Sequence, residues 1–191
     1  MAVNFSITPV RHPADLTDTI SLFYAYAGSL GFDLAFQNFD NEMAGMPGKY
    51  SPPQGELFLA RSEAGVAIGC VGLRPLPSTG AGGKVCEMKR LFVTQAGRGT
   101  GVGKALVSSI IAMAEKLGYD EMRLDTLPSM VVALKMYRDF GFENIAAYYE
   151  TPLEGTHFLS LKLPGQTKNE PDADLGTADA HKRPRLGRTA T

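Results

Sequence analysis

The sequence predicts a domain of the α/β (α+β) class, with a mixed central sheet of about seven strands flanked by about four helices. Short apolar runs typical of strands alternate with longer segments in which apolar residues recur at helical spacing. Segments 57–61 and 66–73 surround a turn at 62–65, which predicts an antiparallel hairpin. A later helix separates two strands and predicts a crossover. Hairpins combined with a crossover favour a mixed sheet covered by helices.

The N-terminal half begins with a short strand that His12 and Pro13 interrupt. Apolar residues at Leu16, Ile20 and Phe23 then follow helical spacing. The elements expected in this half are a strand at 5–11, helices at 15–30 and about 34–43, and strands at 57–61, 66–73 and 85–93.

The C-terminal half contains an amphipathic helix from about Gly101, which Gly118 ends. Ser129 stands where a cap of the next helix is expected. The elements expected in this half are a helix at about 101–117, a strand at 122–125, a helix at 130–140, and strands at 143–150 and 157–163.

We expect one folded domain over residues 1–163 and a disordered tail over 164–191. The tail has no aromatic residue and two widely spaced leucines, Leu175 and Leu186. Such a segment buries too little apolar surface to offset the entropy of ordering it.

Composition narrows the function classes. The net charge of −1 favours neither nucleic acid nor an anionic membrane as a partner. No apolar run is long enough to span a membrane, and the N-terminus lacks a signal-peptide pattern, so we expect a cytoplasmic protein. Cys70 and Cys86 lie in expected strands without metal-ligand spacing, so we expect buried thiols and no bound metal.

The most informative segment is a glycine-rich loop between the strand at 85–93 and the following helix. It contains Arg98 and four glycines at 97, 99, 101 and 103. The first amides of a helix lack backbone partners, and the helix dipole adds partial positive charge there. Glycines let these N–H groups approach an anion, and an arginine fork suits phosphate oxygens. The segment therefore predicts a phosphate-binding site.

The spacing of this loop separates three kinds of phosphate site. A P-loop requires glycine where Arg98 stands and a hydroxyl residue where Ala105 stands. The dinucleotide pattern G-x-G-x-x-G requires glycine at Val102 or Lys104. The pattern that remains is Arg-x-x-Gly-x-Gly, formed by Arg98 and the glycines at 101 and 103.

Two further segments accompany this pattern: Glu-Met-Lys-Arg-Leu-Phe-Val at 87–93, and 133–142 with Tyr137, Gly141 and Phe142. Together, the three segments resemble the GNAT superfamily of N-acetyltransferases. The resemblance implies acetyl-CoA as cosubstrate, no metal, and a mostly antiparallel sheet whose fourth and fifth strands splay apart to admit the pantetheine arm. The cofactor-binding residues that it implies are Leu91, Phe92, Val93, Arg98, Gly99, Thr100, Gly101, Val102, Gly103, Lys104 and Tyr137.

Acetyl transfer to an amine requires a base, donors for the oxyanion and an acid for the thiolate. The resemblance places Glu87 as the base, acting directly or through water, and Tyr137 as the acid. Strand alternation predicts Glu87, Lys89, Leu91 and Val93 on one face. Lys89 could then keep Glu87 ionised or receive an anionic group of the substrate. A backbone N–H near 91–93 is the expected oxyanion donor.

The acceptor is expected to be a primary amine of a small molecule. Arg74 and Lys89 together would suit a carboxylate-bearing, amino-acid-like acceptor. The alternatives are a protein lysine or N-terminus as acceptor, and a non-catalytic acyl-CoA-binding sensor; a homodimer is also left open. The residues considered for acceptor binding are Tyr24, Gln37, Tyr50, Arg74 and Lys89, with Phe36, Tyr148, Tyr149 and His157 as further candidates.

Overall fold

The computed structural model describes residues 4–31, 34–77 and 83–164. They form a sheet in the order β1-β2-β3-β4-β5-β7-β6. Its strands are β1 (Phe5–Pro9), β2 (Glu56–Ser62), β3 (Ala67–Pro75), β4 (Val85–Val93), β5 (Glu121–Thr126), β6 (Glu143–Asn144) and β7 (His157–Lys162). The helices are α1 (Pro13–Ser29), α2 (Phe39–Ala44), α3 (Val102–Lys116) and α4 (Val131–Asp139), with short 3₁₀ turns η1 (Ala35–Gln37), η2 (Gly48–Tyr50) and η3 (Gln95–Gly97).

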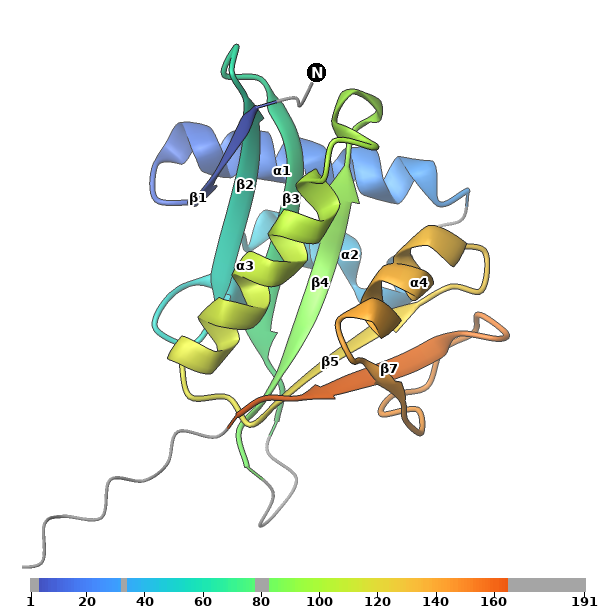
Figure 1. Cartoon of the computed structure of the whole chain (residues 1–191). Helices are drawn as coiled ribbons and strands as arrows, with labels where there is room; N and C mark the ends of the chain where they lie inside the picture. The colour runs from blue at the N-terminus through green and yellow to red at the C-terminus, as the bar shows by residue number, and fades with distance from the viewer. Residues whose placement is uncertain (1–3, 32–33, 78–82, 165–191) are drawn as a thin grey trace, which may run out of the picture.

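The helices cover both faces of the sheet. In Figure 1, α3 and α4 lie in front of the strands and α1 and α2 lie behind them. A large apolar cluster includes Leu106 and Ile110 of α3 with Met88 of β4. A second cluster joins Phe23 of α1 to Leu59 of β2 on the opposite face. The expected mixed sheet covered by helices is confirmed.

The sheet opens between β4 and β5. These strands pair in parallel, but only over Val85↔Glu121, Cys86↔Met122 and Glu87↔Arg123. Beyond Glu87 they diverge, as Figure 1 shows beneath α4. The other neighbouring strands of the described sheet pair antiparallel. The expectation of a mostly antiparallel sheet with a splayed pair is confirmed.

Two expected elements differ from the structure. The strand expected over 143–150 ends at Asn144. The chain then leaves the sheet edge, and the Tyr148 hydroxyl reaches Glu87 on β4. The helix expected over 34–43 is divided at Asn38, whose φ of 58° is left-handed, into η1 and α2. A regular helix cannot pass through that conformation.

The tail expected at 164–191 lies outside the described residues except for its first residue. Within the described ranges, no helix is both long enough and apolar enough to cross a membrane.

Candidate active site at the opening in the sheet

A β-bulge in β4 determines what faces the opening. The β3–β4 register shifts between Cys70 and Gly72, and Arg90 on the facing strand has a left-handed φ of 58°. The bulge reverses the alternation of side chains, because an extra residue shifts the pleat. The expectation that Glu87, Lys89, Leu91 and Val93 share a face is therefore wrong. Leu91 and Val93 pack with the α3 cluster, whereas Glu87 contacts Arg74 on the opposite face.

The bulge also reverses the direction of the peptide groups. Before the bulge, the Leu76 N–H donates to the Val85 carbonyl at 2.9 Å. Every second residue counted from Val85 therefore directs its N–H and carbonyl groups toward β3. After the bulge, the Thr94 N–H donates to the Ile68 carbonyl at 2.9 Å. Peptide directions alternate along a strand, and Leu91 lies three residues before Thr94. The N–H of Leu91 therefore points away from β3 and toward the opening, where β4 no longer pairs with β5. An N–H directed there is suited to a developing oxyanion.

The glycine loop follows β4 and begins α3. Gly99 and Gly101 have φ of 74° and 92°, a region that favours glycine. In the described structure, no backbone carbonyl accepts a hydrogen bond from the N–H groups of residues 99–104. The Arg98 N–H differs, because it donates to the carbonyls of Thr94 and Gln95. Residues 99–104 therefore offer a cluster of free amides at a helix N-terminus, which suits a phosphate.

A pocket of about 640 Å³ connects this loop with β4, the end of α1 and the start of α4. Seven of the expected cofactor residues line it: Leu91, Phe92, Val93, Arg98, Gly99, Gly101 and Gly103. Sequence reasoning missed part of its wall, namely Tyr26 and Ser29 of α1 and Met130, Val131, Val132, Ala133 and Met136 at the start of α4. Ser129 also lines the pocket; the N-cap of α4 is Met130, and it has no capping side-chain hydrogen bond.

The remaining four expected cofactor residues are described in the structure but do not line the pocket. The Thr100 hydroxyl donates to the Gly97 carbonyl at 2.7 Å, the Val102 side chain is buried in the α3 cluster, and Lys104 is exposed. Tyr137 is buried on α4, with its ring 5.8 Å from that of Phe142. Burial, with smaller effects of Tyr26 and Asp125, raises the pKa of Tyr137 well above its usual value. Tyr137 therefore keeps its proton at neutral pH, as an acid must.

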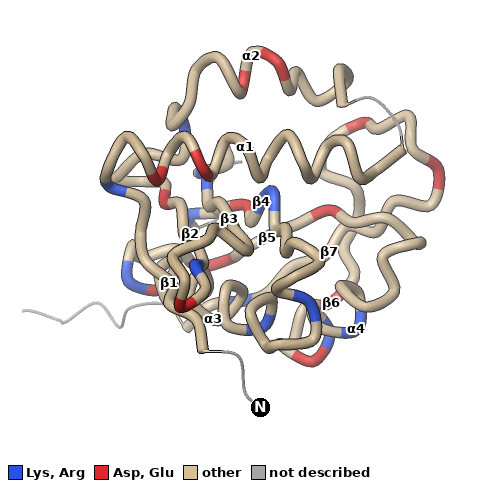
Figure 2. Tube along the Cα trace, turned by 90° about the horizontal axis from the view of Figure 1, so that it is seen from above, with Lys and Arg blue, Asp and Glu red and all other residues tan. Residues whose placement is uncertain are grey.

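Glu87 lies where the pairing of β4 and β5 ends, and only 1% of its side chain is exposed. One oxygen accepts from Arg74 Nε and the other from the Tyr148 hydroxyl, each at 2.7 Å. Lys89 Nζ is 3.7 Å away. Burial, followed by the charge of Glu87, raises the pKa of Tyr148, so its hydroxyl remains a donor. Figure 2 shows acidic and basic positions gathered around β4 and β5.

Lys89 and Asp125 join the two diverging strands. Lys89 Nζ contacts Asp125 Oδ1 at 2.7 Å, two residue pairs beyond the last β4–β5 backbone pairing. Burial alone would raise the pKa of Asp125, but the charge and hydrogen bond of Lys89 contribute to a net lowering. The pair therefore stabilises the geometry of the opening while Asp125 is ionised.

A second pocket, of about 380 Å³, lies beside α2 and η2. Three expected acceptor residues, Gln37, Tyr50 and Arg74, line it. The Gln37 Oε1 atom is buried without a hydrogen-bond partner among the described residues. Of the other two candidates, Tyr24 is 52% exposed on α1 and its ring contacts that of Phe39, whereas Lys89 is buried and paired with Asp125.

Sequence reasoning missed several polar residues near the opening, among them Glu42, Arg90 and Asp125. Arg90 contacts Glu42 through both Nε and Nη2. Asp125 stands alone as an acid in the short strand expected at 122–125, which is the signal that could have drawn attention to it. Within the described ranges, no three His, Cys, Asp or Glu side chains gather to hold a metal ion.

A glycine loop with free amides beside an opening in a mixed sheet is the arrangement that the resemblance to acyltransferases implies. Comparison with known proteins agrees: the model of the Acetyltransferase (GNAT) family matches residues 21–142. An uncharacterized N-acetyltransferase of Schizosaccharomyces pombe is 42% identical over 160 residues, covering 84% of this chain and 96% of its own. Another, from Dictyostelium discoideum, is 32% identical and covers 74% of this chain and 92% of its own.

Solved structures share the fold. A GNAT-family acetyltransferase from Staphylococcus aureus superposes with a TM-score of 0.68 at 18% identity, covering 84% of this chain and all of its own. An acetyltransferase from Salmonella typhimurium, solved with acetyl-CoA, has a TM-score of 0.63 at 20% identity and covers 88% and 98%. The chain belongs to the GNAT superfamily of N-acetyltransferases.

Proposed function

We propose that this protein transfers the acetyl group of acetyl-CoA to the primary amine of a small molecule by direct attack. The observation that carries the proposal is the row of unpartnered amides at 99–104, which opens onto a pocket leading to the divided sheet. The amides would hold the pyrophosphate, and the pocket along β4 and α4 would hold the pantetheine arm. The thioester carbonyl would then lie near the Leu91 N–H.

The size and lining of the second pocket support a small acceptor. Its volume of about 380 Å³ falls within the usual range for small-molecule sites. Its wall includes the side chains of Gln37, Asn41 and Arg74. Arg74 Nε is hydrogen-bonded to Glu87, and Nη1 lies 3.9 Å from Glu42, beyond hydrogen-bond distance, so the Nη donors of this guanidinium can still bind an acceptor carboxylate. The carboxylate proposal thus depends on Arg74, since Lys89 is occupied by Asp125.

In the proposed reaction, Glu87 removes a proton from the amine through a water molecule, because its carboxylate is buried. The neutral amine attacks the thioester carbon, and the Leu91 N–H stabilises the oxyanion. The intermediate then collapses with cleavage of the C–S bond, and Tyr137 gives its proton to the departing thiolate. The nitrogen of the new amide releases its surplus proton, which returns through water to the Tyr137 oxygen.

Calorimetry with acetyl-CoA, CoA and ATP tests the cofactor, and a thiol-release assay over amines tests turnover. The panel pairs amino acids with their amides, which lack a free carboxylate, and adds polyamines and short peptides. We expect amino acids to react faster than their amides. Faster reaction of peptides would identify a protein acceptor, and acetyl-CoA binding without turnover on any amine would identify a sensor. Equal rates for amino acids and their amides would refute the carboxylate proposal.

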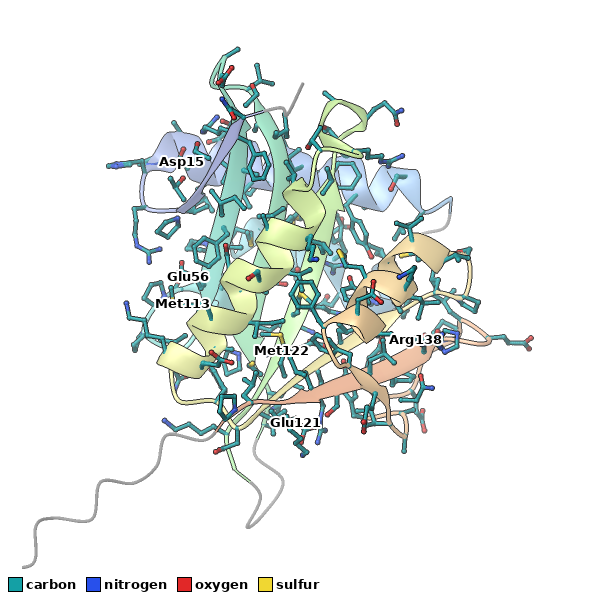
Figure 3. The ribbon with its side chains drawn as sticks, in the orientation of Figure 1. Asp15, Glu56, Met113, Glu121, Met122 and Arg138 are labelled. Atoms are coloured by element: carbon teal, nitrogen blue, oxygen red, sulfur yellow. The ribbon has the colours of Figure 1, made fainter. Side chains whose placement is uncertain are left out.

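The base is tested with Glu87→Gln and a matched control, Glu121→Gln. Glu121 is also a buried carboxylate, bonded to Arg123 and Lys162, but Figure 3 places it at the far end of β5. We expect Glu87→Gln to lower kcat by about 100-fold or more. Affinity for acetyl-CoA should stay nearly unchanged, and Glu121→Gln should retain kcat. An unaltered kcat in Glu87→Gln would remove Glu87 from the mechanism.

A further inference from the structure

We propose that Arg90 and Glu42 are positioning residues for acetyl transfer. Their buried ion pair holds the β4 bulge in the form that turns the Leu91 N–H toward the opening. The inference rests on the proposed function in one respect, that the thioester carbonyl lies at this opening.

The backbone of the bulge needs support from its surroundings. Arg90 is left-handed, with φ of 58°, although it carries a full side chain. Such a conformation is unfavourable for a residue with a Cβ and persists where tertiary contacts hold it. Because the peptide groups reverse direction at this residue, its relaxation would turn the Leu91 N–H away from the opening.

The Arg90 side chain supplies that support. Only 1% of it is exposed, and its Nε and Nη2 atoms lie 3.1 and 2.9 Å from the two oxygens of Glu42. Its guanidinium carbon is 5.0 Å from the ring centre of Phe39 on α2 and 5.9 Å from that of Tyr26 on α1. The guanidinium therefore contacts both helices and connects them to the bulge. A buried cation that loses its carboxylate is left without charge compensation, and we expect the strand that carries Arg90 to shift in response.

Glu42 connects this support to the acceptor pocket. Its carboxylate also accepts a hydrogen bond from the Tyr50 hydroxyl at 2.8 Å and lies 3.9 Å from Arg74 Nη1. Glu42, Tyr50 and Arg74 all line the smaller pocket. An acceptor bound there contacts the carboxylate that holds the bulge. Acceptor binding and the direction of the Leu91 N–H are therefore coupled.

The test compares Arg90→Lys and Glu42→Gln with a control, Arg61→Lys. Arg61 also ties α1 to the sheet, through Asp15 and Asp18 at 2.7 Å. Figure 3 places Asp15 near β1 and β2, away from the opening. Arg90→Lys keeps the positive charge but loses the planar, bidentate contact with Glu42. All three proteins are studied as the full chain.

Two measurements separate positioning from folding. Infrared difference spectroscopy of bound acetyl-CoA carrying ¹³C at the thioester carbonyl reports hydrogen bonding to that oxygen without any acceptor. We expect a shift to lower frequency in the wild type and in Arg61→Lys, and loss of most of it in the Arg90 and Glu42 variants. On the best amine of the panel, kcat should fall about 10- to 100-fold in these two variants. The dissociation constant for CoA should change by less than about threefold, because residues 99–104 are untouched.

An unchanged carbonyl band and kcat in Arg90→Lys and Glu42→Gln would overturn the inference, as would an equal loss in Arg61→Lys. A wild type that binds no acetyl-CoA would instead refute the proposed function. If both variants fail to fold, Tyr50→Phe decides, because it removes one hydrogen bond from Glu42 and keeps the buried ring. A smaller band shift and lower kcat in Tyr50→Phe support the coupling, and wild-type values overturn it.

Discussion

Replacing Gly101 with alanine tests whether the conformation of the glycine loop is needed to bind CoA. Gly101 is the N-cap of α3 and has φ of 92°, and an added Cβ would meet no atom within 4 Å. The cost is therefore backbone strain rather than a clash. A left-handed residue with a Cβ is disfavoured by about 1–2 kcal/mol.

The other end of the same helix offers a matched control. Gly118 follows α3 with φ of 74°, and its Cβ would also meet open space. Gly118→Ala should destabilise the fold by about 1–2 kcal/mol, and each kcal/mol lowers Tm by about 2–4 °C in a domain of this size. Only the loop at Gly101 presents amides to the ligand. If the loop relaxes in the free Gly101→Ala protein, the fold loses less stability, but CoA binding must then restore the strain, and the affinity for CoA falls by up to about 5- to 30-fold.

The assay is calorimetric titration of each variant with CoA, together with thermal unfolding. Gly118→Ala should lose stability and retain the wild-type dissociation constant, whereas Gly101→Ala should lose less stability and bind CoA more weakly. Equal affinity in the two variants, with equal losses of Tm, would refute the role assigned to the loop conformation.

Three further predictions address single side chains. Arg98→Ala should weaken CoA binding by about 10- to 100-fold at low salt and by less at high salt, because salt screens the charge of an exposed cation. Calorimetry at two salt concentrations measures this effect, and affinities equal to those of the wild type would contradict it. Tyr137→Phe should lower kcat by about 100-fold with little change in CoA affinity, and a wild-type rate would leave this ring with a packing role alone. The pKa of Asp125 is lowered in the folded protein. Its ion pair with Lys89 therefore contributes its full stabilisation at pH values above the ordinary aspartate pKa of about 3.9, and this contribution is lost as the pH falls through the lowered pKa. Unfolding measured from pH 7 downward should therefore show Asp125→Asn less stable than wild type near neutrality, with the two curves converging in acid; a constant difference would argue against the pair.

The sequence predicted the features that local patterns determine. Period-2 and period-3.6 spacing located the main elements, including β4 at its observed bounds, 85–93. Glycines at 99 and 101 occupy the two loop positions where φ is positive. Resemblance in three segments indicated the division between the fourth and fifth strands, which local spacing alone does not contain.

Long-range contacts account for what the sequence did not show. Nothing in the pattern around Arg90 indicates a left-handed residue, because it is held there by Phe39 and Glu42, about fifty positions earlier in the chain. Strand alternation therefore assigned Leu91 to the wrong face. Similarly, the strand predicted over 143–150 included Tyr148, but this residue lies off the sheet edge, where its hydroxyl donates a hydrogen bond to Glu87.

The divided sheet has a consequence for the order of events. One pocket runs between α1, β4 and α4, and the other lies beside α2, so the two ligands would have separate entrances. Donor and acceptor could then occupy the protein together, and neither must leave before the other arrives. An enzyme with this arrangement does not need to form a covalent acyl-enzyme intermediate between the binding of the donor and the binding of the acceptor. Initial-rate plots at varied concentrations of both substrates should accordingly intersect rather than run parallel.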